Sequence, residues 1–403
     1  MKKIILFTIA AVLTGLQPLH AQDCQTNADL DASPGKYLTA AQYPWPAVRA
    51  EYFRNLVTAA DKAQAKQTLV YIENEEQKSH DALKLTGGNW ENYYSTDGYS
   101  YLGAARAGKY YFQSALHEFF CFKGKLKRND EASTILRVYV NSIPLNTLNR
   151  FLQNPFGSSL GEYDFGLQFL DWKNHKPADV NAQLISLFSF LSCNNETLLR
   201  AINTGNGFFQ DVPEKEIKPN NRNTSIYRYW FVKKNNTPLL VPVSRKEYLQ
   251  SLLEYYEREK LYFPMLIGKL NSEHSSSVKQ YSNWAADVNA KIAVVKKSLS
   301  DHDDAWLAAQ AVMNYLEDKS QNYKAGLTER TNYNRFWKFY DNEKKSEGLF
   351  KYNPDYFKTG TQNPARPQII SLAFRYVPVA SSIRILDNFT KNFDFEALKK
   401  ILQ

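Results

Sequence analysis

Glu162 and Asp164 are the pair of side chains in this 403-residue chain that we would test first for catalysis. If their segment is extended, residues two apart point to the same side, so both carboxylates would face one substrate. A glycoside hydrolase needs such a pair, and it needs no local sequence motif around it. A secreted hydrolase that acts on carbohydrate is therefore one function that the sequence leaves open.

Three short motifs resemble known sites but have the wrong surroundings. GSSLG at 157–161 matches a nucleophile elbow around Ser159, yet Pro155 stands where a buried strand is required. GAARAGKY at 103–110 resembles a phosphate-binding loop with a tyrosine in place of the magnesium-binding hydroxyl. NADLDAS at 27–33 begins like a calcium loop and lacks the turn glycine. None of the three motifs predicts a site.

The chain also lacks the usual spacing of metal ligands. Its histidines form no HxH, HxxxH or HExxH pattern, and no CxxC occurs. Asp301, Asp303 and Asp304 lie at the start of an expected helix, where acidic residues usually cap the helix and complement its dipole. We predict no metal site and no cofactor.

The segment RYWFVKKNNTPLLVPVSRKEYL at 228–249 is dense in aromatic residues. Asn235 and Asn236 tolerate the backbone of a two-residue turn, which predicts a β-hairpin on either side of them. In that register Pro238 and Pro242 lie where no hydrogen-bond donor is needed. The second strand, 238–243, is therefore predicted to be an edge strand.

The same register divides the side chains between two faces. One face is predicted to join the core and holds Trp230, Val232, Leu239, Val241 and Val243. The other face holds Tyr227, Tyr229 and Phe231, which form either a second packing layer or a platform for a glycan or peptide. Tyr and Phe stripes are more often core, so we favour packing and keep these three as the candidate binding residues.

The first residues, MKKIILFTIAAVLTGLQPLHAQ, have the charged start, short apolar run and small final residue of a secretory signal peptide. We expect cleavage between Ala21 and Gln22, without lipid on Cys24. No other apolar run is long enough to span a bilayer. The product is thus expected to be exported, periplasmic or secreted, and not membrane-spanning.

Charge and cysteine content restrict the partners and the compartment. The formal charge of +9 falls to +7 without Lys2 and Lys3, and the basic residues are scattered in pairs, which is typical of a solvated surface. Export further disfavours nucleic acid. Three cysteines permit one disulfide in an oxidising compartment, with three pairings; Cys121 and Cys193 are the candidate pair.

The expected architecture is α+β, in two domains after the leader at 1–21. An irregular arm at 22–46 precedes a domain at 47–175 with an antiparallel sheet and a packed helix. A more helical domain with the β-hairpin follows at 176–403.

Further elements are expected within these two domains. A capping box at Ser244 and Glu247 begins a helix, and a heptad seam over 278–299 predicts a second helix packed along it. The remaining elements expected are helices at 55–79, 178–193, 196–202, 300–318 and 395–402, and strands within 110–144, 335–341 and 367–377.

These expectations favour one class of function over two others. Because no nucleophile, metal or phosphate signature survives, the leading hypothesis is a non-enzymatic exported protein that binds or assembles at the envelope. Its partner would be an envelope protein or a glycan. The alternatives are the carbohydrate-active hydrolase and a protein that binds acidic polymers through its scattered positive charge.

Overall fold

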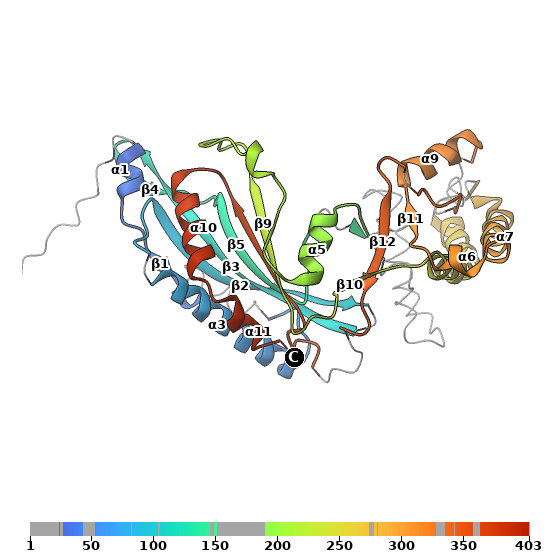
Figure 1. The fold of residues 1–403 in the computed structure, drawn as a ribbon, viewed down its shortest axis with the longest axis horizontal. Helices are drawn as coiled ribbons and strands as arrows, with labels where there is room; N and C mark the ends of the chain where they lie inside the picture. The colour runs from blue at the N-terminus through green and yellow to red at the C-terminus, as the bar shows by residue number, and fades with distance from the viewer. Residues whose placement is uncertain are drawn as a thin grey trace, which may run out of the picture.

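The computed structural model shows a mixed α+β fold with two β-sheets in the residues that it describes (Figure 1). The described residues are 24, 27–42, 53–81, 83–103, 105–145, 149–150, 190–273, 278–279, 281–327, 335–341, 343–357 and 363–402.

The larger sheet has eight strands among the described residues and forms the body of the molecule. Its order is β1 (Tyr37–Leu38), β2 (Gly88–Leu102), β3 (Ala105–Phe122), β5 (Thr134–Val140), β13 (Ile370–Tyr376), β9 (Ile226–Val232) and β8 (Phe209–Gln210), and β4 (Lys125–Arg128) pairs with β3. β1 runs parallel to β2, and the other pairs are antiparallel. The strands expected within 110–144 and 367–377 are confirmed.

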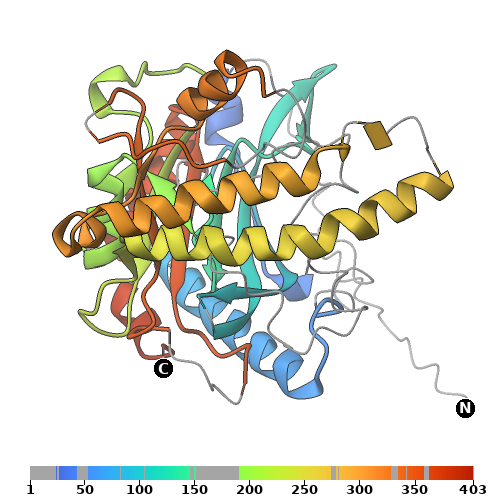
Figure 2. The ribbon, with the colours of Figure 1, turned by 90° about the vertical axis from the view of Figure 1, so that its right-hand side faces the viewer.

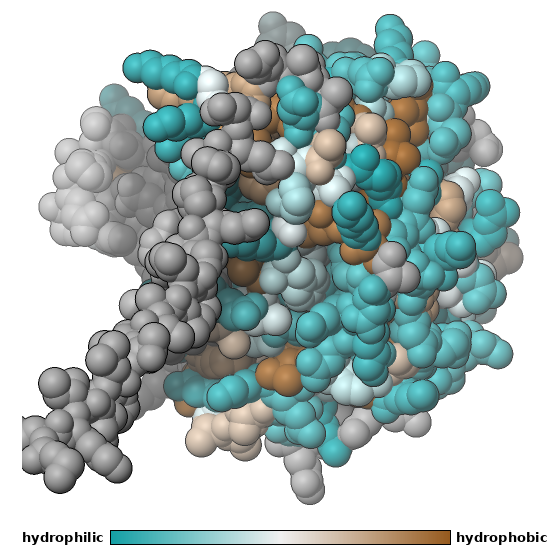
Figure 3. Space-filling view, turned by 90° about the vertical axis from the view of Figure 1, so that its left-hand side faces the viewer, coloured by the Kyte–Doolittle hydropathy of each residue, from teal (hydrophilic) through white to brown (hydrophobic). Residues whose placement is uncertain are grey.

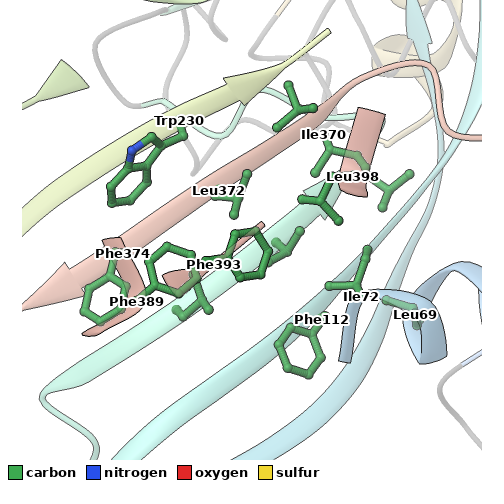
Figure 4. Close-up of a cluster of buried hydrophobic side chains, with 14 of the residues drawn as sticks. Leu69, Ile72, Phe112, Trp230, Ile370, Leu372, Phe374, Phe389, Phe393 and Leu398 are labelled. Carbon is green, nitrogen blue, oxygen red and sulfur yellow. The ribbon is translucent and has the colours of Figure 1, made fainter. Parts of the chain in front are cut away.

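One face of this sheet carries the main core. Alternate residues of β3 and β13 point to this face, among them Phe112, Leu372 and Phe374. They pack against α3 (Ala59–His80), α10 (Ala380–Asn392) and α11 (Phe395–Lys399), as Figure 4 shows for Leu69, Phe389 and other side chains. The helices expected at 55–79 and 395–402 are confirmed. Thr58 caps α3 by accepting a hydrogen bond from the Asp61 N–H.

The expected hairpin at 228–243 is wrong, because β9 pairs with β13 and β8 instead. Beyond β9 the chain leaves the large sheet, and β10 (Leu240–Pro242) joins the second sheet. The physical reason is packing. β13 offers a buried apolar strand along the whole length of β9, whereas a local partner containing two prolines could offer only a short ladder. Leu239 and Val243 consequently lie in clusters away from Trp230.

The edge-strand part of that prediction is confirmed. β10 ends its sheet and pairs only with β12 (Glu347–Tyr352) among the described strands. On the outer side of β10, the side-chain amide of Asn203 makes the hydrogen bonds that a neighbouring strand would otherwise make. Leu240 N–H donates to Asn203 Oδ1 over 2.9 Å, and Asn203 Nδ2 donates to the Leu240 carbonyl over 3.0 Å. This contact joins α5 (Glu196–Thr204), on the far face of the large sheet, to the second sheet.

In the described part of the chain the second sheet has five strands, in the order β10, β12, β7 (Leu191–Cys193) and β6 (Asn149–Arg150), with β11 (Val312–Met313) also paired to β12. It corrects three expectations. The end of the predicted helix 178–193 is strand β7, and the rest of that segment lies outside the described residues. Residues 335–341 form no strand. The predicted helix 300–318 is divided into α8 (Asp304–Ala308), β11 and α9 (Tyr315–Lys324), because pairing with β12 interrupts it.

A long helical hairpin packs beyond the second sheet. α6 (Arg245–Glu273) and α7 (Trp284–Asp301) run side by side (Figure 2). The heptad residues Tyr281, Val288, Ile292 and Val295 are buried together with Tyr248, Leu252 and Tyr255 of α6. The predicted seam is confirmed. Ser244 caps α6 by accepting from the Glu247 N–H, while the Glu247 carboxylate accepts from Lys351, so only half of the capping box forms.

The N-terminal arm differs from the sequence-based expectation. The arm expected to be irregular contains α1 (Asn27–Ala32), β1 and the 3-10 helix η1 (Ala40–Gln42); a further 3-10 helix, η5 (Glu214–Glu216), precedes β9. The expected boundary near 175 lies outside the described residues. Strands from both sides of it, β5 and β13, are neighbours in one sheet.

α5 ends at Gly205, whose φ of 67° is the left-handed conformation expected of a helix stop.

The disulfide joins Cys24 to Cys121, and Cys193 is free and buried. The candidate pair Cys121–Cys193 is therefore wrong. Cys193 lies in β7 of the second sheet, whereas Cys121 lies where β3 extends toward β4 at the opposite end of the molecule (Figure 1). A disulfide is typical of an oxidising extracellular compartment. No helix within the described residues is long and apolar enough to cross a membrane.

Candidate functional site

The face of α3 that packs on the sheet carries carboxylates as well as apolar side chains. Leu69 and Ile72 are followed on the same face by Glu73 and Glu76, one helical turn apart. Glu73 is 7% exposed and Glu76 is fully buried. Buried carboxylates are costly unless the protein supplies hydrogen bonds, so their partners decide what this cluster can do.

Donors from two segments, η1 and β2, surround Glu73. Its Oε1 accepts from the Ala40 N–H over 2.7 Å and from Asn92 Nδ2 over 3.0 Å, and its Oε2 accepts from the Tyr94 hydroxyl. Asn92 is itself oriented by Ser114, whose hydroxyl donates to Asn92 Oδ1 over 2.6 Å. Glu73 therefore fastens the η1 segment to the sheet through α3.

Glu76 is enclosed in the same way. Its Oε1 accepts from Trp90 Nε1 over 2.8 Å, and its Oε2 accepts from the Tyr37 hydroxyl. His80 Nε2 lies 2.7 Å from Oε1, one turn further along α3. Burial, reinforced by the negative charge of Glu76, raises the pKa of Tyr37 far above its usual range. Tyr37 therefore stays protonated and remains a donor to Glu76.

A cavity of about 340 Å³ opens beside this cluster. It lies between the end of α3, the segment 37–42 and the turn that follows α3, and it is lined by Tyr37, Thr39, Gln42, Gln77, His80, Asp81, Leu83 and Leu85. Its volume is at the lower end of the range for small-molecule pockets. Tyr37 and His80 form one wall, with ring centroids 5.5 Å apart.

Several polar groups at the rim of this cavity are available to a ligand. Gln77 and Asp81 are exposed, and their side chains have no hydrogen-bond partner in the described part of the chain. Gln42 uses Oε1 to accept from Thr39, which leaves its amide NH2 free to donate. The cavity thus combines an apolar wall from Leu83 and Leu85 with amide and carboxylate groups. We define it as the α3 pocket.

The predicted binding residues lie elsewhere, on the opposite face of the sheet. Tyr229 is 7% and Phe231 2% exposed, in a cluster with Phe209 and Tyr356, and Tyr227 is partly buried. The expected division of the aromatics between two faces holds for Trp230 and Val232 against these three. The packing interpretation agrees with the burial, and a binding role for these residues stays a prediction.

The predicted catalytic pair, Glu162 and Asp164, and the rejected elbow around Ser159 lie outside the described residues. Asp303 caps α8 by accepting from the Trp306 N–H over 2.8 Å, as expected of an acidic residue at a helix start. Within the described residues no group of three or more potential ligands could hold a metal ion.

The sequence contained a signal for the α3 cluster that motif searching missed. Leu69, Ile72, Glu73, Glu76 and His80 follow the spacing of one helix face, so the apolar stripe runs directly into two carboxylates and a histidine. A charged group that continues an apolar stripe must be buried with partners. The partners Tyr37, Trp90 and Asn92 belong to other segments and gave no local pattern.

Comparison with known proteins identifies no relative of this chain. No family model, no curated protein and no solved structure matches the chain.

Proposed function

We propose that this protein is an exported, non-enzymatic binding protein that holds a small neutral carbohydrate in the α3 pocket. The observation that carries the proposal is the combination in one cavity of an aromatic ring, an apolar wall and free amide and carboxylate groups. A sugar presents an apolar ring face and several hydroxyls, and it matches such a lining.

The state of the nearby carboxylates supports binding rather than hydrolysis. A glycosidase needs two carboxyl groups that reach the scissile bond from either side. Glu73 and Glu76 are instead occupied by donors from Ala40, Asn92, Tyr94, Trp90 and Tyr37, and both are buried. They lie behind the residues that line the pocket, and each of their oxygens already accepts a hydrogen bond from the protein.

Export is the second part of the proposal. The signal-peptide pattern before Gln22 and the Cys24–Cys121 disulfide support an oxidising destination, periplasmic or extracellular. Sequencing the N-terminus of the exported protein tests this part. A first residue of Gln22 is expected, and a lipid-modified Cys24 would contradict it.

A glycan array followed by calorimetric titration of the best ligands tests the pocket. Replacing Gln77 or Asp81 by Ala removes a hydrogen-bonding group from the rim, which should weaken binding about tenfold. Gln67→Ala is the matched control, because Gln67 is an exposed glutamine of the same helix away from the pocket. Absence of any glycan ligand, or equal losses in Gln77→Ala and Gln67→Ala, would reject the proposal.

The same ligands can be checked for turnover. Products formed by the wild-type protein and lost in Glu162→Gln or Asp164→Asn would replace the proposed function by the hydrolase. Unchanged ligand after prolonged incubation is the expected result.

A further inference from the structure

The β3–β4 hairpin, residues Phe119–Arg128, extends past the rest of the large sheet. β3 pairs with β2 as far as Glu118 and with β5 as far as Leu116, and from Phe119 onward its only strand partner in the described chain is β4. Figure 1 draws this hairpin at one end of the molecule, beside α1 and remote from α6 and α7. The hairpin is thus a two-stranded ribbon, and no other strand of the described chain pairs with it beyond Phe119.

One face of the ribbon exposes two phenylalanines. Phe120 is 42% and Phe122 53% exposed, and residues two apart in a strand share a face. Their cross-strand partners on that face are Lys127 and Lys125. Figure 3, which views this end of the molecule, shows apolar residues in brown among polar residues in teal. Exposed rings directly opposite lysines are not a core arrangement.

The hairpin is also strongly basic. Residues 119–128 hold three lysines, one arginine and no acidic residue. Arg128 is paired with Glu91 and Asp130, but Lys123, Lys125 and Lys127 are exposed and have no ion-pair partner in the described part of the chain. Lys123 lies over the Phe122 ring, 5.4 Å from its centroid. Three positive charges thus surround two apolar rings.

The opposite face of the ribbon is supported from behind. Cys121 is bonded to Cys24, and the Cys24 N–H donates to the Gly124 carbonyl over 3.2 Å. Lys123 and Gly124 both have positive φ, 52° and 73°, as a tight two-residue hairpin turn requires. The disulfide and the turn hold the ribbon in one shape, so little ordering entropy opposes binding through the free face.

We propose that this free face binds the surface of a lipid bilayer that contains anionic lipids. Phe120 and Phe122 enter the headgroup region, where apolar rings are stabilised, and the three lysines contact lipid phosphates. A soluble polyanion would explain the lysines alone and would leave the two phenylalanines in water. The apolar residues therefore favour a membrane surface over an acidic polymer.

Flotation with vesicles tests the proposal on the whole mature protein. Vesicles of phosphatidylglycerol and phosphatidylcholine should bind it, vesicles of phosphatidylcholine alone should not, and added salt should release it. Replacing Lys123, Lys125 and Lys127 together by Gln should weaken partitioning roughly 100-fold. Phe120→Ser with Phe122→Ser should weaken it at least tenfold at unchanged charge.

The matched control removes the same charge at the other end of the molecule, as Lys319→Gln with Lys344→Gln and Lys345→Gln, all exposed positions. It should bind vesicles as the wild type does, and circular dichroism should show all variants folded. Two results would overturn the proposal. One is an equal loss in the control, which indicates a net-charge effect. The other is retention of binding by the phenylalanine variant together with equally tight binding to dextran sulfate.

Discussion

Two of the regions that bury charged side chains in this protein do so in different ways. Under the large sheet, Glu73 and Glu76 receive neutral donors from several segments and border the α3 pocket. Between α6 and α7, Glu259 is paired with the ammonium of Lys291 and also accepts a hydrogen bond from Tyr255. Lys291 Nζ lies 2.5 Å from Glu259 Oε2, and both side chains are essentially unexposed.

The two regions differ in the kind of partner that stabilises each buried carboxylate. The charge of Glu259 is balanced by Lys291, whose ammonium also lies 4.8 Å from the Tyr256 ring centroid. Burial raises the pKa of Glu259 to about 7 and lowers that of Lys291, in spite of their mutual attraction. A carboxylate that accepts hydrogen bonds from several groups keeps most of its stabilisation when one of those groups is removed. A buried ion pair does not tolerate the loss of its partner.

The largest effect is expected from removing Lys291. Lys291→Met leaves Glu259 buried without a cation, which should lower the free energy of unfolding at neutral pH by about 3–5 kcal/mol. Urea denaturation measures this loss. Lys297→Met is the control, because Lys297 belongs to the same helix and pairs with Asp301 at the surface. That control should show no measurable change, and similar losses in both variants would refute the contrast.

A smaller effect is expected in the α3 cluster. Glu76→Gln keeps one acceptor oxygen but turns an NH2 group toward Trp90 Nε1 or Tyr37, which are themselves donors. The expected loss is about 1–3 kcal/mol by the same denaturation assay. Glu75→Gln should cost less, because Glu75, although largely buried itself, pairs with Lys78, whose side chain is exposed. A loss in Glu76→Gln as large as in Lys291→Met would show that dispersed donors give no protection.

The Lys291→Met loss should depend on pH. A carboxyl with a raised pKa stays protonated in the folded state while it ionises in the unfolded chain, so stability falls as pH rises from about 4.5 to about 7. Without the ammonium this dependence strengthens. Lys291→Met should therefore lose roughly 1–2 kcal/mol less at pH 5 than at pH 8. A loss that is constant across this range would mean that Glu259 is not the group left unpaired.

The smallest change is expected from replacing the whole ion pair. Glu259→Leu with Lys291→Met removes both charges together, and stability should return to within about 1 kcal/mol of the wild type. Its unfolding free energy should also lose the pH dependence that distinguishes Lys291→Met. Failure of this double variant to recover would show that the pair is needed for packing rather than for charge balance.

Local patterns in the sequence were sufficient wherever one segment carried the whole signal. The heptad seam over 278–299 predicted the packing of α7 along α6, and the helix expected at 196–202 is α5. The apolar run in 367–377 predicted β13, and the two prolines predicted an edge at 238–243. In each case the period of the side chains and the turn or cap residue lie within a few positions of one another.

Tertiary structure alone decided which segments meet. β9 took β13 as its partner, more than 130 positions away, over the adjacent segment, because the distant strand offered more apolar surface to bury. Cys121 found Cys24 rather than Cys193 because the β3–β4 hairpin lies beside the N-terminal arm. Glu73 and Glu76 continue the apolar stripe of their helix, but only the folded chain brings Tyr37, Trp90 and Asn92 close enough to supply their hydrogen bonds. Partner choice of this kind depends on burial summed over distant segments, and a single stretch of sequence does not contain that sum.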